Sequence, residues 1–476
     1  MKKAKRTSCG ASASRRLPPP DVLTRIAFCI GDAPTLFSFL EALESSDVRG
    51  PLEPLWRLGL NTDRARLWPR LHLDERSASA TPRGRDLAAI AKYYNRVVVR
   101  GACDFAWLRR HLHPDATIEW QAMPAASASL GAWYDEWATF PITHVHMAGS
   151  PIDHVVRVLP SLTHLVGLDL SMTKCPSKAA LLELVSTSKL TELALHNVHD
   201  DRDGMSYSSS MLRHLIQWLK NPTTTVRKFG FGGDLLMLDE AFDVREAVTA
   251  EFFTTLFRDC KALETLHLSA VDLGDLDLAA HAPLPMTELA LDHCLLEAKD
   301  LDRLGAALAA SPNVRRLTAR GLCVPAGQAG FEALWRALPR TQLESLDMGR
   351  CVLQDRGTKG TTPVNWLPLA PLLPQLPRLA SLKLDGNGIN DDVAAVLAHV
   401  IIMDTTCLQS LNLEGNEMGP SGIQALLATT PHGETPVRSL ALGRMYNIPT
   451  PDGDMLHDLA YRRGIELRLT YPMMSY

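Results

Sequence analysis

Leu408-Gln-Ser-Leu411-Asn-Leu413 carries the pattern that decides the fold of this 476-residue chain. An apolar residue is followed by two variable residues, then by Leu, one variable residue and Leu. The single residue between the last two leucines indicates a β-strand, because successive side chains of a strand point to opposite faces. The stretch therefore predicts a short strand that buries its leucines on one face and presents variable residues on the other.

The same pattern occurs ten times along one region of the chain. The copies begin at Leu165, Leu190, Val226, Leu263, Met286, Val314, Leu343, Leu379, Leu408 and Val437. Their starts lie 23 to 37 residues apart, and apolar residues at helical spacing follow the strands, as in residues 391–399. A strand followed by a helix in each repeat predicts a parallel sheet with helices on its other side.

These copies resemble leucine-rich repeats of the long, ribonuclease-inhibitor-like class over Leu165 to Leu442. The resemblance implies an α/β fold, a solenoid with a curved parallel sheet inside and helices outside. We assign residues 161–476 to this solenoid. Ile465, Leu467 and Leu469 predict a final strand that caps it.

A small buried polar group is expected directly after several strands. Asn387 and Asn416 hold this place in two repeats, where a side-chain amide can bind backbone groups as the chain leaves the sheet. Other repeats place different residues there, namely Thr173, Asp234, Cys294 and Cys351. The pattern therefore predicts that both asparagines are buried and hydrogen-bonded to the backbone.

Residues 63–160 follow the pattern less closely, and we interpret them as degenerate repeats. Ile142-Thr-His-Val145-His-Met147 fits it, and strand-like runs occur at 71–73, 96–99 and 117–119. Helices are predicted between them at residues 84–94, 105–112 and 129–138. Three later repeats exceed the usual length through insertions at 199–210, 235–248 and 354–365, which are expected to form surface loops.

Residues 17–62 do not follow the repeat and predict a small all-helical module. A Leu-Pro start, an apolar first helix and a late Leu-Trp pair resemble an F-box. That resemblance implies docking of residues 17–60 on the Skp-type adaptor of a cullin ubiquitin ligase. The expected adaptor contacts are Leu17, Pro18, Leu23, Ile26, Leu36 and Leu40. Alternatively, the module only caps the solenoid and covers the leucines of its first repeat.

Composition excludes several classes of protein. The net charge of -4 gives no basic stripe for nucleic acid, and no apolar run reaches the ~18 residues of a membrane span. The nine cysteines are scattered and never spaced as CxxC, which favours reduced thiols in a cytoplasmic or nuclear protein. Residues 1–16 are basic and predict a disordered tail.

The variable residues between the leucines should form the concave face of the solenoid. They predict a protein partner, because charges of both signs alternate there without aromatic rings. The expected contacts are His144, His146, Asp169, Glu192, His196, Lys228, His267, Glu288, Asp292, Arg316, Arg320, Asp347, Lys383, Asp385, Asn412 and Glu414.

Motifs for chemistry are weak in this sequence. His144 and His146 should stand about 7 Å apart on one strand, which is wide for a shared metal ion. Gly230-Phe-Gly-Gly233 lacks the Lys-Ser/Thr of a phosphate-binding loop and falls inside a repeat strand. We therefore expect no catalytic residue, metal or cofactor.

These features predict a protein-interaction module that is not an enzyme. The first hypothesis is the substrate-receptor subunit of a cullin-type ubiquitin ligase. The alternative is an interaction scaffold or inhibitor without a link to a ligase. A minor alternative is a GTPase-activating protein that resembles the Ran activator, which uses the same class of repeat.

Overall fold

The computed structural model describes most of the chain, within the residues 18–123, 130–149, 152–199, 204, 206–233, 242–274, 276–325, 327–354, 361–402, 407–428, 439–444, 450–462 and 466–470. The predicted tail, Leu17 and Asp234 lie outside these ranges. The chain divides into two compact units, one of Met1–His146 with Ser161–His164 and one of Met147–Pro160 with Leu165–Tyr476. We call them unit 1 and unit 2 and describe each by itself.

Unit 1 begins with a helical module. Its helices are α1 (Pro20–Cys29), α2 (Ala33–Ala42), α3 (Ser46–Arg49) and α4 (Glu53–Gly59). The side chain of Asp32 caps α2 by accepting a hydrogen bond from the backbone N–H of Thr35 at 2.8 Å. Helix α4 ends on Gly59, where a Cβ atom would lie 2.0 Å from the ring of Phe37. The close approach of these helices therefore depends on a glycine.

The rest of unit 1 consists of the degenerate repeats. Strands β1 (Leu71–Leu73), β2 (Arg96–Arg100), β3 (Thr117–Gln121) and β4 (Ile142–Ala148) pair in parallel and in chain order. Helices α5 (Pro82–Ala91), α6 (Phe105–His111) and α7 (Leu130–Trp137) alternate with them. The strands and helices predicted for residues 71–147 are thus confirmed, with ends shifted by a few residues.

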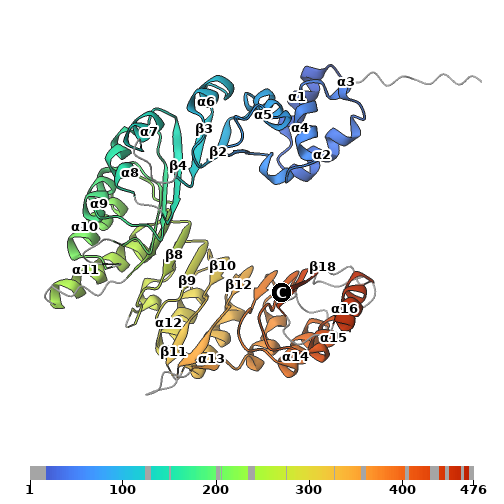
Figure 1. Cartoon of the computed structure of the whole chain (residues 1–476). Helices are drawn as coiled ribbons and strands as arrows, with labels where there is room; N and C mark the ends of the chain where they lie inside the picture. The colour runs from blue at the N-terminus through green and yellow to red at the C-terminus, as the bar shows by residue number, and fades with distance from the viewer. Residues whose placement is uncertain are drawn as a thin grey trace, which may run out of the picture. The chain divides into compact units, whose positions relative to one another are not determined.

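Unit 2 repeats the same alternation with more regular strands (Figure 1). Its parallel strands, in sheet order, are β5 (Gly167–Ser171), β6 (Glu192–His196), β7 (Lys228–Gly232), β8 (Thr265–Ser269), β9 (Glu288–Asp292), β10 (Arg316–Thr318), β12 (Ser345–Asp347), β15 (Ser381–Lys383), β16 (Ser410–Asn412), β17 (Ser439–Arg444) and β18 (Glu466–Thr470). The predicted final strand is β18, although Ile465 lies outside the described residues.

The helices of unit 2 follow its strands, as the repeat pattern predicts. They are α8 (Asp153–Val158), α9 (Lys178–Thr187), α10 (Ser209–Leu219), α11 (Phe242–Thr254), α12 (Ala298–Ala309), α13 (Gln328–Ala337), α14 (Asp391–Ile402), α15 (Pro420–Ala428) and α16 (Thr450–Arg462). The strand leucines, such as Leu346, Leu382 and Leu411, are buried. The predicted fold class, a leucine-rich-repeat solenoid with a parallel sheet and a helical N-terminal module, is confirmed. None of the helices within the described ranges is long and apolar enough to cross a membrane.

A left-handed residue ends most strands of unit 2. It stands two positions after the last apolar residue of the repeat pattern and is Met172, Asn197, Ala270, His293, Gly321, Arg350, Gly386 or Gly415. The following side chain then points back under the sheet. In two repeats this side chain is Asn387 or Asn416, both buried as predicted.

Asn416 shows why an amide suits this place. Its Oδ1 accepts hydrogen bonds from the N–H groups of Asn387 and Ile389, at 2.8 and 3.1 Å. Its Nδ2 donates to the carbonyls of Leu384 and Leu413, both at 2.9 Å. Asn387 repeats the arrangement toward the repeat before it, accepting from the N–H of Cys351 and donating to the carbonyl of Met348. These amides replace backbone partners that the turning chain has lost.

A second, small sheet was not predicted. Strand β11 (Cys323–Pro325) pairs in parallel with β13 (Val352–Gln354), which pairs antiparallel with β14 (Thr361–Pro363). The last strand comes from the insertion at 354–365, which we expected to be a loop. The prediction missed β14 because Thr361–Pro363 is exposed and therefore has no buried-face alternation. The insertions at 199–210 and 235–248 are described only in part, and both end in helix where a loop was expected, since Ser209 and Ser210 begin α10 and residues 242–248 belong to α11.

Candidate protein-binding face

The open face, as we use the term, is the sheet face that carries the side chains between the buried leucines. The predicted contacts occupy strand positions on it or lie two residues after the end of a strand. His144 and His146 lie on β4 of unit 1, whereas the predicted contacts from Asp169 to Glu414 belong to unit 2. Within unit 2 the structure brings these residues together in small groups of opposite charge.

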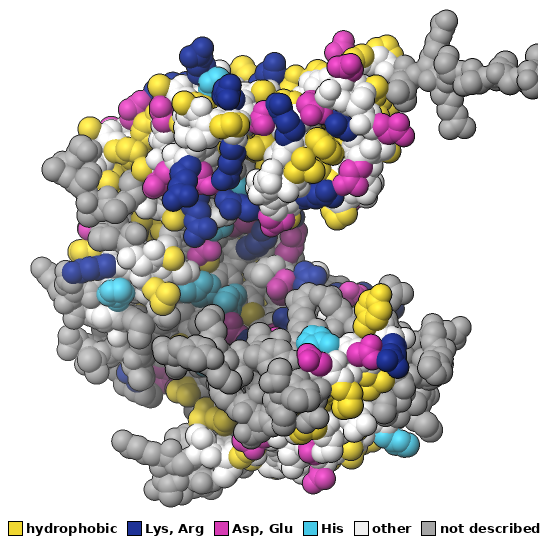
Figure 2. All heavy atoms as spheres, turned by 45° about the vertical axis from the view of Figure 1, so that its right-hand side comes forward, with side chains coloured by type: hydrophobic (Ala, Val, Ile, Leu, Met, Phe, Trp, Pro, Cys, Tyr) yellow, Lys and Arg dark blue, Asp and Glu magenta, His cyan; other side chains and the backbone are white. Residues whose placement is uncertain are grey.

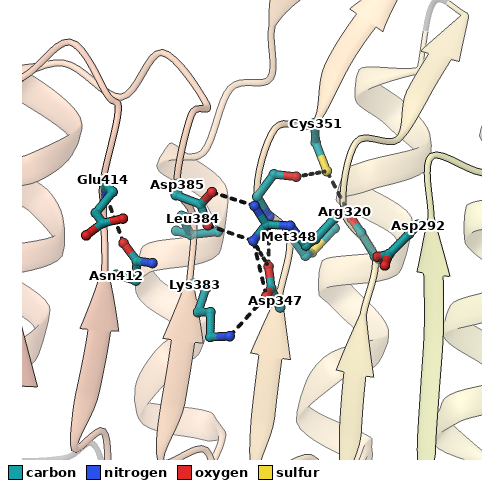
Figure 3. A network of polar contacts seen from close by, with 12 residues as sticks. Asp292, Arg320, Asp347, Met348, Cys351, Lys383, Leu384, Asp385, Asn412 and Glu414 are labelled. Carbon is teal, nitrogen blue, oxygen red and sulfur yellow. Dashed lines mark hydrogen bonds and ion pairs between the residues drawn. The ribbon is translucent and has the colours of Figure 1, made fainter. Parts of the chain in front are cut away.

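The largest group surrounds Arg320, two residues after the end of β10 (Figure 3). Its guanidinium donates to Asp347 Oδ1 at 3.0 Å and to both carboxylate oxygens of Asp385, at 2.9 and 2.7 Å. Lys383 Nζ lies 3.3 Å from Asp347 Oδ2. Two cations and two carboxylates thus form a closed network across β10, β12 and β15.

Gly349 makes this reach across two strands possible. A Cβ atom at this position would lie 2.6 Å from Asp385 Oδ1 and 2.9 Å from an Nη atom of Arg320. Any larger residue would displace the ion pair. The backbone N–H of Gly349 also donates to Asp347 Oδ1 at 3.2 Å.

Most charged side chains of this network are largely buried, which strengthens the interactions between them. The side chains of Asp347 and Asp385 are only 7% and 12% exposed, and that of Arg320 is 28% exposed. The hydrogen bonds that Arg320 donates to Asp385, together with the charge of Asp347, raise the pKa of Arg320 despite its partial burial. The guanidinium is therefore held charged against carboxylates that water reaches poorly.

A second group joins two histidines and a carboxylate. The rings of His196 on β6 and His267 on β8 lie 4.3 Å apart, and His267 Nε2 lies 2.8 Å from Asp292 Oδ2. The His196 ring passes over Gly230 of β7, where a Cβ atom would lie 2.6 Å from His196 Nε2. Gly230, first weighed as part of a phosphate loop, thus makes room for this histidine.

The two ends of this group differ electrostatically. Burial is the main cause that lowers the pKa of His196 to about 4, and the charge of the neighbouring His267 adds to it. The charges of Asp169 and Asp292 act in the opposite direction. Burial alone would raise the pKa of Asp292, but the hydrogen bond and charge of His267, with Arg320, bring it below its usual range. His196 is therefore neutral at pH 7, and Asp292 is ionised.

We predict that His196 makes the stability of unit 2 pH-dependent. Its folded pKa of about 4 lies below its ordinary value of 6.5, so on acidification the unfolded chain binds the proton first. Its contribution is complete above pH 6.5 and is lost as the pH falls toward 4. The loss between pH 7 and pH 5 should be roughly 2 kcal/mol.

Urea unfolding of the full chain at pH 7 and pH 5 measures this effect. The His196→Gln variant should show a smaller change between the two pH values. His457→Gln removes an exposed histidine on α16 and should behave like the wild type. Equal pH dependence in wild type and His196→Gln would contradict the prediction.

Two further ion pairs lie closer to solvent. Lys228 Nζ is 3.0 Å from Glu192 Oε2, and Arg316 is 3.1 Å from Glu288 Oε2. The side chains of both cations are more than half exposed. Such pairs contribute about 0–1 kcal/mol to stability, so these cations are available to a partner at little cost to the fold.

The histidines of unit 1 are coupled to residues that the sequence analysis did not select. The rings of His144 and His146 lie parallel, with centroids 6.4 Å apart. His146 Nε2 is 3.4 Å from Glu119 Oε1, and Glu119 also pairs with Arg70 at 2.8 Å. The hydrogen bond with His146 is the main cause that lowers the pKa of Glu119 to about 2. Strand alternation through 117–119 was the signal that could have identified Glu119.

Within the described ranges, no group of three or more His, Cys, Asp or Glu residues is arranged to hold a metal ion.

The predicted adaptor contacts separate into two sets. Leu23, Leu36 and Leu40 are buried in the helical module, so they support its core. Ile26 is 42% exposed, and Val22, one helical turn earlier, is 43% exposed. Pro18 is also exposed, and Leu17 lies outside the described residues. An outside partner can therefore reach α1 through Val22 and Ile26 but not through the three leucines.

Comparison with known proteins agrees with the repeat assignment. The chain is 27% identical over 235 residues to the ribonuclease inhibitor of Sus scrofa, which covers 47% of this chain and 46% of that protein. The fold of this chain is a leucine-rich-repeat solenoid. The chain matches about half the length of that curated relative, and no family model matches the sequence.

Two solved structures of Listeria monocytogenes internalins are also similar to the leucine-rich-repeat chain. The first has a TM-score of 0.38 and 16% identity, and the match covers 83% of this chain and 92% of the internalin. The second, an internalin C2, has a TM-score of 0.22 and 15% identity, with 54% and 74% covered.

Proposed function

We propose that this chain is a non-catalytic receptor that holds a protein partner on the open face of unit 2. The observation that carries the proposal is the row of charged groups whose positions are set before binding. Arg320, Asp347 and Asp385 hold one another by hydrogen bonds, so a partner would meet an ordered surface. Ordered charges of both signs contribute more to the choice between protein partners than to the strength of binding. The likeness to a ribonuclease inhibitor, a protein named for binding another protein, supports this reading.

Charge reversal at the exposed cations tests this role. Lys228→Glu/Arg316→Glu should abolish affinity capture of proteins that the tagged wild type retains from a cell extract, while the fold persists. Arg258→Glu/Arg336→Glu changes the net charge equally at exposed positions in η4 (Thr255–Asp259) and α13. An identical set of captured proteins with all three would contradict binding through the open face.

The more specific proposal is that the receptor delivers substrates to a cullin-type ubiquitin ligase. The exposed Val22 and Ile26 on α1 support it, because an apolar strip on a terminal helix can dock on a Skp-type adaptor. The open face would then be left for the substrate, and ubiquitin transfer would take place on partner enzymes. If α1 does not dock, the remaining function is an interaction scaffold or inhibitor.

Co-expression with a Skp-type adaptor separates these two functions. Wild type should co-purify with the adaptor, and Ile26→Asp should lose it. Val396→Asp on α14 is the matched control, since Val396 has a similar exposure of 38%. Absence of the adaptor from wild-type preparations would leave the scaffold or inhibitor function. A GTP-hydrolysis assay with Ran-type GTPases tests the minor GTPase-activating alternative, and no stimulation is expected.

A further inference from the structure

The open face of unit 1 carries two arginines, Arg96 and Arg100, that form no ion pair with the residues described there, unlike the cations on the open face of unit 2. The register aligns His72 of β1, Val98 of β2 and Glu119 of β3, so residues two positions away share their face. Arg96 and Arg100 flank Val98 on this face. Both are exposed at the ends of β2, whereas Val98 between them is buried. We call Arg70, His72, Arg96 and Arg100 the arginine face.

Positive charge dominates this face. Within β1–β3 the open-side carboxylate is Glu119, which is already bound by Arg70 and His146. Asp74 follows β1 on the same side and lies 3.6 Å from Arg83. Across the part of unit 1 that the structure describes, neither Arg96 nor Arg100 has an ion-pair partner. In unit 2, by contrast, Lys228, Arg316 and Arg320 each contact a carboxylate. The arginine face therefore has cationic groups without an internal counter-charge.

A further cation, Arg66, lies near the arginine face. Burial, then the charges of Arg66 and Arg70, lowers the pKa of His72, so the imidazole stays neutral beside these cations. Figure 2 shows dark-blue Lys and Arg side chains in the upper part of the view, over elements of unit 1, with magenta Asp and Glu side chains among them. The nearest acidic side chains at the strand ends are already engaged. Glu75 accepts a hydrogen bond from the N–H of Ala102, and Asp74 lies near Arg83 and Ser77.

We propose that the arginine face binds an acidic, extended peptide segment of a protein partner. Arg96 and Arg100 stand four residues apart on one strand, about 13 Å along its axis. In an extended peptide that lies along β2, carboxylates four residues apart are separated by the same distance. Each guanidinium can bind one carboxylate through two parallel hydrogen bonds. This surface belongs to unit 1, and the proposal does not depend on the function proposed for unit 2.

A protein segment fits better than nucleic acid. Binding of single-stranded nucleic acid combines cationic groups with aromatic rings that stack on the bases. The large apolar side chains that are exposed in the described part of unit 1 are Val22, Ile26 and Leu60, none of them aromatic or on β1–β3. The arginine face therefore offers salt bridges but no stacking surface.

The test uses the full chain and a fluorescent decapeptide of alternating Glu and Ser, followed by fluorescence polarisation. Alternation places carboxylates on one side of the extended peptide, including pairs four residues apart. Arg96→Glu/Arg100→Glu should weaken binding at least about tenfold. Arg258→Glu/Arg336→Glu, with the same change in net charge, should bind like wild type. Arg96→Lys/Arg100→Lys keeps the charge but not the two-pronged geometry, and its affinity should be intermediate.

Three results would overturn the proposal. One is equal peptide affinity of the wild type and the Arg96→Glu/Arg100→Glu variant, with both shown to be folded by circular dichroism and thermal unfolding. Another is a peptide affinity that falls equally in the Arg258→Glu/Arg336→Glu control, which would mean non-specific attraction. The third is tighter binding of a single-stranded oligonucleotide that is lost in the same Arg96 and Arg100 variant, which would assign the face to nucleic acid.

Discussion

Arg320→Met should lower the free energy of unfolding of unit 2 by about 3 kcal/mol, because it leaves two buried carboxylates without their common partner. Asp347 would keep Lys383 and the N–H of Gly349 as partners, whereas Asp385 would lose the ion pair that holds both its carboxylate oxygens. The methionine preserves most of the apolar contact of the arginine stem, so the loss reports the charge. Urea unfolding of the full chain, followed by circular dichroism, measures it.

The matched control is Arg316→Met, the same substitution four residues earlier in the chain, on β10. Arg316 is 55% exposed and pairs with Glu288 near solvent, so its loss should cost less than about 1 kcal/mol. Adding Asp385→Asn to Arg320→Met should recover part of the stability, because one uncompensated charge is removed. Equal losses for Arg316→Met and Arg320→Met would show that burial does not strengthen the network.

Asn416→Ala should lower the free energy of unfolding by about 4 kcal/mol. The substitution removes four hydrogen bonds and leaves the N–H groups of Asn387 and Ile389 and the carbonyl of Leu384 buried without partners. A cavity under the turn adds to the loss. Because each repeat packs on its neighbours, the damage should spread to β15 and β16, and amide hydrogen exchange of these strands should accelerate.

Two variants make this prediction specific. Asn412→Ala removes a half-buried amide that accepts one hydrogen bond, from the N–H of Glu414 at 2.9 Å, and should cost about 1 kcal/mol. Asn416→Cys introduces the residue that stands at this place in another repeat, Cys351, whose Sγ lies 3.2 Å from the carbonyl of Ala319. It should be intermediate. A loss for Asn416→Ala no larger than that for Asn412→Ala would mean that water replaces the amide.

Together these effects separate two tasks on one face of unit 2. Arg320 and its carboxylates are buried enough to stabilise the sheet, so their loss should appear first in unfolding experiments. Lys228 and Arg316 are exposed and weakly stabilising, so their reversal should appear first in binding experiments. A partner interface of this kind can change at its exposed cations without loss of the fold.

The sequence by itself determined the strands of the large sheet, most of the helices between them and the class of fold. The reason is local: a leucine on every second position buries one face of a strand, and this alternation needs no distant residue to be recognised. The burial of Asn387 and Asn416 was predictable for the same reason, since their place is counted from the preceding strand. The pattern also placed the variable residues on one face of the sheet.

Only the tertiary structure decided which of these residues meet. Arg320 reaches Asp385, 65 positions further along the chain, because three strands lie side by side and Gly349 leaves space between them. Repeat lengths from 23 to 37 residues hide such pairs in the sequence. Packing likewise buried Leu36 and Leu40 of the helical module while leaving Ile26 exposed. Contacts across strands depend on side-chain reach and on the absence of an intervening Cβ atom, and neither is encoded in the spacing of leucines.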